Sequence, residues 1–196
     1  MPYEAAQGRR VNAIGAYFSH GPQAGRLELE TCACLPKGNK RKGAKGRARR
    51  PRPPPEQAAA AHGLTASEVG ISDAQRLLAF VWRVAGRPVG APAGWRRERP
   101  LVIVLDNYSV HQSRAVRGER AALEAAGVTL FALPSYSPEL SAIEPIWHDV
   151  KHHQLTRRSY ALLGELKRAV DAALRGKAGL LRDARARTEH LLEQAT

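Results

Sequence analysis

Two acidic residues stand where the chain leaves predicted core elements. Asp106 directly follows the apolar run 101–105, and Glu144 begins a predicted helix after a second apolar run, 128–133. Ligands of open α/β sheets bind at the carboxyl ends of strands, and carboxylate oxygen is the donor that Mg²⁺ prefers. Two such carboxylates could share divalent ions that activate a water against a phosphodiester. This chemistry normally uses a third carboxylate, for which the sequence offers no clear candidate.

Each carboxylate alone also has a structural explanation. Asp106 and Asn107 can turn the chain or cap the next helix. Ser141 and Glu144 fit the S-x-x-E pattern of a capping box. Pro145 supports a helix start here, but it also disfavours helical backbone at the residue before it. Only the pair of acidic residues, taken together, favours a metal site.

Other residues with metal-binding or reactive side chains give weaker signals. His111 follows the first acidic residue by five positions and could meet a phosphate or a substrate. His148 and His152 are spaced i and i+4 on one predicted helix, which is the minimum for a shared metal. Because no H-E-x-x-H motif is present, a basic helix face near DNA fits these two better. Cys32 and Cys34 are too few for a four-cysteine zinc site or a disulfide scaffold, which indicates reduced thiols.

The positive charge of the chain is concentrated in one segment. The 196 residues hold 31 Lys+Arg against 18 Asp+Glu, a net charge of +13. Removing the nine basic residues of segment 37–55, which has no acidic residue, leaves +4 for the rest. Such a run attracts phosphate backbones through counterion release, although a solvated loop without a dedicated partner is the alternative. The nine are Lys37, Lys40, Arg41, Lys42, Lys45, Arg47, Arg49, Arg50 and Arg52.

The elements that must position these residues follow from apolar periodicity and from Gly and Pro. Segments 11–18 and 26–31 predict a hairpin, and 37–70 predicts a basic, Pro/Gly/Ala-rich insert or linker with no clear period, whose order the sequence leaves open. The runs 101–105 and 128–133 are apolar throughout, which is typical of strands covered on both faces. We expect four helices. The first runs from 72 to 86, the second begins after Asn107 and ends near residue 126, and the others cover 142–155 and 159–175, with Gly176 ending the last. The tail could add a short helix over 180–192.

The predicted organisation has four parts. Residues 1–36 form an N-terminal hairpin, 37–70 the insert, 71–176 the core and 177–196 a helical tail. A hydrophobic fraction of 43% allows a packed core. No apolar run approaches the roughly 20 residues of a membrane-spanning helix, and MPYEAAQGRR is unlike a signal peptide. We therefore expect a cytoplasmic α/β protein with no membrane partner.

The order of motifs around the two acidic residues resembles the catalytic domain of DDE-type transposases. Within these, the most similar group is the bacterial insertion-sequence branch allied to mariner-like elements. The pattern is a strand followed by Asp-Asn and a nearby His, then a second strand, a Leu-Pro-x-Tyr-Ser-Pro-x-Leu loop, Ile-Glu, a Trp and a Lys. The matching residues are Asp106, Asn107, His111, Leu133, Pro134, Tyr136, Ser137, Pro138, Leu140, Ile143, Glu144, Trp147 and Lys151.

The resemblance implies a ribonuclease-H-like mixed sheet flanked by helices. It implies Mg²⁺- or Mn²⁺-dependent cleavage at transposon ends and strand transfer into target DNA. Asp106 and Glu144 would be the second and third catalytic carboxylates, both metal ligands. Asn107, His111, Tyr136 and Lys151 would be substrate or DNA contacts. The implied partners are terminal inverted repeats, target DNA and, in the complete protein, a second copy in a homodimer associated with the bacterial nucleoid.

Two departures from the family pattern shape the expected activity. Ser141 replaces the usual Asn. The family's first Asp lies on a strand upstream of the Val11-Asn12-x-x-Gly15 match, so we expect a sheet incomplete at the N-terminus and a hairpin with an open edge. The sequence also lacks the family's helix-turn-helix. We therefore expect a C-terminal fragment that is poorly active or inactive alone.

Two other functions remain open at this stage. The chain could be a non-catalytic DNA-binding remnant of a decayed insertion element, acting through the basic segment. It could also be a ribonuclease-H-like nuclease of another kind. The loop 134–140 disfavours that second alternative, because its pattern is particular to the transposase branch.

Overall fold

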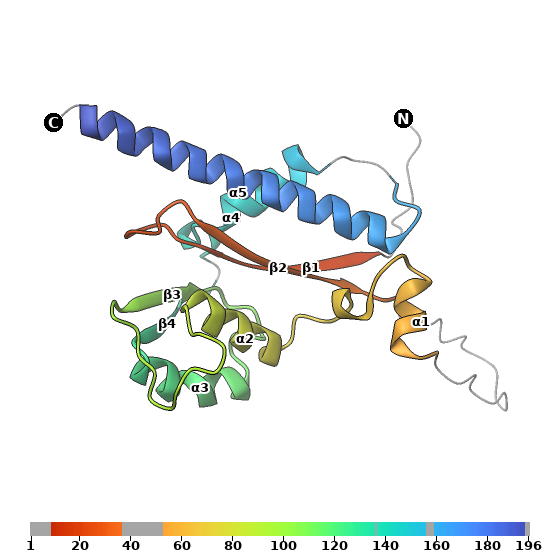
Figure 1. Cartoon of the computed structure of the whole chain (residues 1–196), viewed down its shortest axis with the longest axis horizontal. Helices are drawn as coiled ribbons and strands as arrows, with labels where there is room; N and C mark the ends of the chain where they lie inside the picture. The colour runs from red at the N-terminus through yellow and green to blue at the C-terminus, as the bar shows by residue number, and fades with distance from the viewer. Residues whose placement is uncertain (1–8, 37–52, 136, 156–158, 195–196) are drawn as a thin grey trace.

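The protein is a mixed α/β structure in which helices accompany two separate two-stranded sheets (Figure 1). The computed structural model describes residues 9–36, 53–135, 137–155 and 159–194. The α/β class predicted from the sequence is confirmed. One continuous mixed sheet was expected, but the described strands form an antiparallel pair and a parallel pair that are not hydrogen-bonded to each other.

The first sheet is the expected hairpin. β1 (Arg10–Tyr17) pairs antiparallel with β2 (Leu27–Cys34), in a register that places Tyr17 opposite Leu27 and Arg10 opposite Cys34. Gly21 and Gly25 in the connecting turn both have positive φ, which glycine adopts without steric cost. β2 continues three residues beyond the predicted segment, and its Cys32 and Cys34 are free thiols. Burial raises the pKa of the Cys34 thiol above its usual value.

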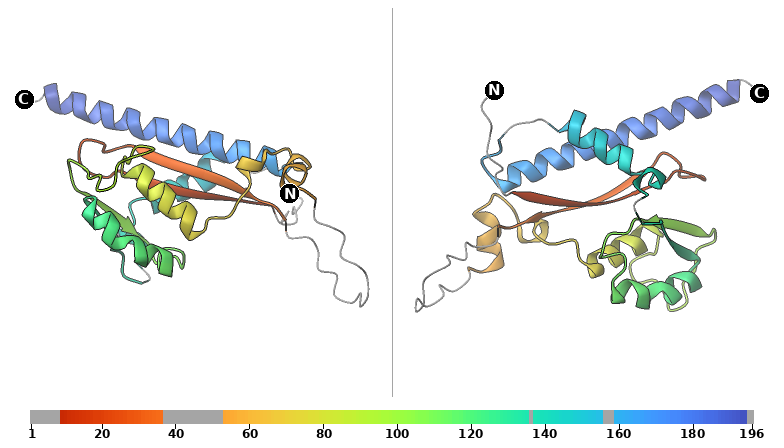
Figure 2. Two further views of the ribbon diagram at one scale, coloured as in Figure 1. Left: turned by 60° about the horizontal axis from the view of Figure 1, so that its bottom comes forward. Right: turned by 180° about the vertical axis from the view of Figure 1, so that it is seen from behind.

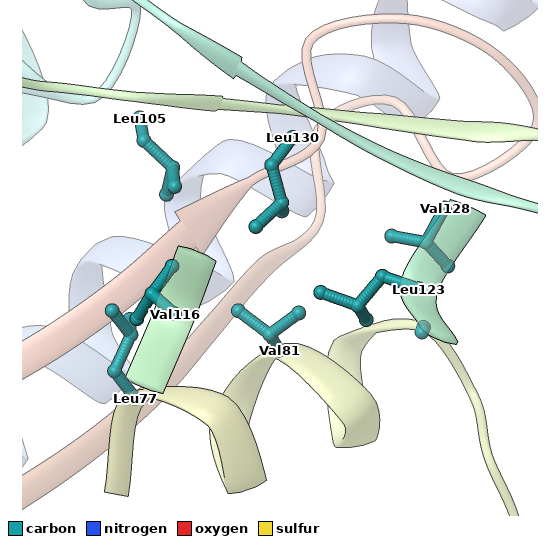
Figure 3. Close-up of a cluster of buried hydrophobic side chains, with 8 residues drawn as sticks. Leu77, Val81, Leu105, Val116, Leu123, Val128 and Leu130 are labelled. Carbon is teal, nitrogen blue, oxygen red and sulfur yellow. The ribbon is translucent and has the colours of Figure 1, made fainter. Parts of the chain in front are cut away.

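The second sheet joins β3 (Leu101–Leu105) and β4 (Val128–Ala132) in parallel, connected by helix α3 (Arg114–Ala125). Helix α2 (Ala74–Val84) lies beside α3 against the same face of this sheet (Figure 3). Side-chain oxygens begin both helices, because Asp73 accepts from the N–H of Arg76 and Ser113 from that of Val116. The core between these elements consists of Leu77, Val81, Ala85, Leu105, Val116, Leu123, Val128 and Leu130.

The prediction that β3 is covered on both faces is wrong. Val102 and Val104 are 61% and 53% exposed, and Phe131 on β4 is 54% exposed. α2 and α3 cover only one face, while the other carries these apolar side chains in the open. A continuous apolar run indicates a buried strand, but it contains no information on whether the described chain supplies a cover for each face.

The segment before α2 contains two short helices. α1 (Pro55–Ala60) and the short 3₁₀ helix η1 (Ala66–Glu68) lie inside the predicted insert 37–70, whose order the sequence had left open. Alanine favours helix, and the buried Ala59 packs with Leu163 in a small second core. Residues 37–52, which hold the basic run, lie outside the described residues.

The C-terminal helices cover the hairpin. α4 (Glu144–Asp149) continues into a π-helical turn, η3 (Val150–Gln154), and α5 runs from Leu163 to Gln194. Figure 2 shows the hairpin lying between α5 and the half built from α2, α3, β3 and β4. The predicted stop at Gly176 is wrong, because α5 passes through it and absorbs the predicted tail helix.

A buried ion pair fixes α5 on the hairpin. Lys167, 7% exposed, bonds Asp171 at 2.8 Å, and Thr31 of β2 donates to the same carboxylate. The last turns of α5 extend beyond the other elements, with Leu191 and Leu192 exposed (Figure 1). Among the described residues, none of the helices combines the length and apolarity that a bilayer crossing requires.

Candidate active site

Asp106 lies directly after β3, where the strand ends at the surface. Its Oδ1 accepts the backbone N–H of Tyr108 at 2.9 Å and lies 2.7 Å from Nδ1 of His111. The side chain is 50% exposed. Its second oxygen, Oδ2, has no hydrogen-bond partner among the described residues. The turn therefore holds the carboxylate in one orientation and leaves an oxygen open to a ligand from solution.

His111 is oriented by the same turn. Its ring is only 18% exposed, packs edge-on against Tyr108 with a 5.9 Å centroid distance, and contacts both Oδ1 and the carbonyl oxygen of Asp106 through Nδ1. A neutral imidazole bonded in this way carries its proton on Nδ1, which leaves Nε2 able to accept. The structure thus brings together Asp106 and His111, which the sequence had proposed as separate candidates.

Asn107 connects the ends of the two parallel strands. Its Nδ2 donates to the carbonyl of Leu133, just after β4, at 2.7 Å. The backbone N–H of Leu133 donates in turn to the carbonyl of Leu105 at 2.8 Å. These bonds fix the start of loop 134–140 relative to Asp106, a positioning role that the sequence alone did not suggest for the amide.

Glu144 is the first residue of α4 and does not form the capping box that its spacing suggested. Ile143 is the N-cap, no side chain caps the helix, and the N–H of Glu144 donates to the carbonyl of Ser141 rather than to its hydroxyl. Pro145 fits the first turn because it lacks the N–H that would be unbonded there. Within the described chain the Glu144 carboxylate has neither a hydrogen bond nor an ion pair. The structural explanation for this residue therefore fails.

Packing against the hairpin positions α4. The ring of Trp147 lies against Gly15 of β1 so closely that an added Cβ would stand 2.7 Å from two ring atoms. Asp149 bonds Lys177 of α5 at 2.9 Å, and this bond holds the pKa of the Asp149 carboxyl below its usual value. The glycine of the Val-Asn-x-x-Gly match therefore has a structural role that the sequence alone did not show, because only glycine at position 15 leaves room for the Trp147 ring.

A groove of about 800 Å³ runs from β1 past α2 and β3 to the segment leading into α4. Asp106 and His111 lie at its wall, as do residues 140–143, but Glu144 is not among its lining residues. The described residues contain no group of three or more His, Cys, Asp or Glu side chains arranged to hold a metal. Asp106 therefore lies in the groove, whereas Glu144 lies outside its lining on α4, and no contact joins the two carboxylates among the described residues.

The structure describes only some of the remaining candidate residues. Tyr136 and the basic residues of the insert lie outside the described residues, and Lys151 is exposed on η3. The rings of His148 and His152 approach to a 4.4 Å centroid distance on the exposed side of α4 and η3. Two imidazoles alone do not complete a metal site.

Each of the two carboxylates, taken separately, is a donor that suits a hard divalent cation. Oδ2 of Asp106 and the carboxylate of Glu144 are anionic oxygens with no partner in the described chain, and Mg²⁺ and Mn²⁺ take such ligands. Among the described residues that line this groove, His20 and His111 are the imidazole donors, and no cysteine thiol lines it.

The described structure is an α/β fold with an acidic residue at the carboxyl end of a parallel strand. A family model described as DDE superfamily endonuclease matches residues 67–167, more than half of the 196 residues. The chain belongs to this family. Its members act on DNA and generally use divalent metal ions, so DNA is the substrate class. Among curated proteins, none matches the chain.

Proposed function

We propose that this chain is part of a transposase of a bacterial insertion sequence, with Asp106 and Glu144 as two of its catalytic carboxylates. The observation that carries the proposal is the carboxylate of Asp106, held through Oδ1 by Tyr108 and His111 with Oδ2 open at the end of a parallel strand. In this account the transposase cleaves DNA at terminal inverted repeats and transfers the freed strand to target DNA, and this chain alone is poorly active.

The residues around the site have different proposed roles. Asp106 and Glu144 would hold Mg²⁺ or Mn²⁺, which supplies Lewis-acid stabilisation of phosphate and a more acidic water. His111 fixes the rotamer of Asp106, and Asn107 fixes Leu133, just after β4. Tyr136 and Lys151 are proposed DNA contacts, and the basic segment 37–52 attracts the phosphate backbone.

The broader assignment follows from the resemblance of the motifs. We propose a ribonuclease-H-like arrangement, a homodimer as the form that acts on transposon ends, and association with the bacterial nucleoid. The basic insert supports the last point, because nine positive charges in one segment favour DNA at moderate ionic strength.

A plasmid-nicking assay tests the catalytic assignment. The whole chain is incubated with supercoiled DNA and Mn²⁺, alongside Asp106→Asn and Glu144→Gln. Glu124→Gln is the matched control, since Glu124 is an exposed carboxylate on α3 away from the groove. We expect slow nicking that falls by about 10²-fold or more in both site variants and stays unchanged in the control. Equal nicking by all four proteins would refute the assignment.

The basic segment favours a second candidate function, a DNA-binding remnant without catalysis. That alternative predicts a salt-sensitive DNA affinity that survives Asp106→Ala and Glu144→Ala. The affinity would collapse on deletion of residues 37–52. Binding measured by fluorescence anisotropy at several salt concentrations, together with the nicking assay, separates the two functions.

A further inference from the structure

Three histidines lie close together on the exposed side of α4 and η3. The ring centroid of His148 lies 4.4 Å from that of His152 and 6.3 Å from that of His153. All three residues are exposed, and none of them lines the groove that holds Asp106. Because two imidazoles alone do not complete a metal site, the position of the third ring decides what this cluster can bind.

The π-helical turn brings His153 to the side of His148. In an α-helix, which turns by about 100° per residue, the fifth residue after His148 would lie about 140° further round the axis. A π turn closes its hydrogen bonds between i and i+5, and the N–H of Leu155 donates in this way to the carbonyl of Val150 at 2.9 Å. The wider turn leaves both the fourth and the fifth residue after His148 beside its ring, as the two centroid distances show. This helix face therefore presents three imidazoles where a regular α-helix would present two.

The ring separations are close to those of imidazoles that share one ion. With Zn–N bonds of about 2.0–2.1 Å, two rings bound to one tetrahedral ion have centroids about 5 Å apart. The two separations from His148, 4.4 and 6.3 Å, lie on either side of that value. Among the described residues no group of three is already arranged to hold a metal. Binding therefore needs ring movements of roughly 1 Å, which exposed side chains make without disturbing the packing.

The neighbouring carboxylate is engaged elsewhere, so the available donors are imidazoles. Asp149 follows His148 in the chain, but its Oδ2 is bonded to Lys177 at 2.9 Å and accepts from Gln154 at 3.5 Å. Imidazole nitrogen suits Zn²⁺, Ni²⁺ and Cu²⁺, whereas Mg²⁺ and Mn²⁺ favour carboxylate oxygen. The cluster thus differs in ligand chemistry from the acidic site at Asp106.

We propose that His148, His152 and His153 bind one borderline divalent cation, Zn²⁺, Ni²⁺ or Cu²⁺, on the surface of the π turn. Three imidazoles leave the fourth position of a tetrahedral ion open to solvent. The bound ion links the last turn of α4 to η3 and holds the π turn in place. This inference does not depend on the proposed catalytic function, because it uses neither Asp106 nor Glu144.

Titration of the whole chain with Zn²⁺, followed by isothermal calorimetry, tests the proposal. The titration is done at about pH 7.5, where an ordinary imidazole is neutral and able to bind metal. We expect the affinity for one ion per chain to fall by about tenfold or more in each of His148→Ala, His152→Ala and His153→Ala, because loss of an outer-shell partner alone has an effect of that size. His190→Ala is the matched control, since it removes an exposed histidine of α5.

Electron paramagnetic resonance of Cu²⁺ bound to the unaltered chain gives a second readout that needs no substitution. We expect the splitting pattern of three nitrogen donors. Unchanged Zn²⁺ affinity in all three variants overturns the proposal. A loss confined to His148→Ala and His152→Ala also overturns it, because the pair would then act without His153. So does a loss in Asp106→Asn with none in the histidine variants, because Zn²⁺ would then occupy the acidic site.

Discussion

Gly164 should be intolerant of alanine even though it lies within a helix. It is the second residue of α5, is buried, and donates its N–H to the carbonyl of His62 at 2.9 Å. A Cβ added at Gly164 would stand 2.8 Å from the carbonyl carbon of Gly63 and closer still to its oxygen. Both are backbone atoms, so no rotamer change relieves the overlap. The loop after α1 would have to separate from α5.

The magnitude follows from two opposing terms. Overpacking typically costs about 1–3 kcal/mol, and alanine recovers at most about 1 kcal/mol of helix propensity. We therefore expect Gly164→Ala to lower the free energy of unfolding by about 1–2 kcal/mol. Gly176 lies in the same helix with nothing within 4 Å of an added Cβ. Gly176→Ala should raise the free energy of unfolding by about 0.5–1 kcal/mol.

Urea denaturation followed by circular dichroism measures both variants against the parent chain. Thermal melts provide a second readout, since 1 kcal/mol shifts Tm by roughly 2–4 °C in a chain of this size. Because the two substitutions are the same and lie in one helix, opposite changes in the free energy of unfolding would report on the packing around each glycine rather than on helix propensity. A stabilising Gly164→Ala would refute the contact between α5 and the loop after α1. A destabilising Gly176→Ala would refute the continuity of α5.

Three further predictions address the hairpin, the open sheet face and the acid response. Gly15→Ala should displace Trp147 and lower stability by about 1–3 kcal/mol, seen as a changed tryptophan fluorescence spectrum and a lower urea midpoint. Val104→Ala should change stability by less than about 0.5 kcal/mol, whereas Leu130→Ala on the covered face should cost about 2–5 kcal/mol in the same assay. The Thr65 N–H bonded to Glu68 lowers the pKa of that carboxyl from 4.5. The resulting stabilisation is present above pH 4.5 and is lost as pH falls through the lowered value; Glu68→Gln should flatten that part of a urea midpoint-against-pH profile.

Local signals predicted much of the fold. Alternation in 26–31 and the glycines before it predicted the hairpin, and the apolar runs 101–105 and 128–133 predicted β3 and β4. The helix predicted from residue 72 agrees closely with α2, whose N-cap is Asp73. These features depend on neighbours in the sequence, so they can be inferred from it.

Features that depend on distant contacts were not predicted. Gly176 is a helix-ending residue by propensity, but the packing of Ala173, Leu174 and Ala178 against the hairpin and α4 carries α5 through it. Whether β3 would be covered on both faces depends on which elements reach it, which an apolar run does not encode.

In the candidate site, too, the residue types could be inferred from the sequence, whereas the contacts between them could not. The sequence predicted Asp106 and Glu144 as metal ligands, which stays a prediction, and the capping box expected of Glu144 does not form. The bond between His111 and Asp106 and the bond from Asn107 to Leu133 arise from turn geometry that residue types alone do not specify.

Mn²⁺ binding to the whole chain, followed by paramagnetic broadening of its amide resonances, tests the central claim most directly. We predict broadening confined to residues 106–111 and 143–147, abolished by Asp106→Asn, weakened by Glu144→Gln and unchanged by Glu124→Gln. Broadening that persists in both site variants, or that centres on His148 and His152, would contradict the assignment of Asp106 and Glu144 as the metal ligands.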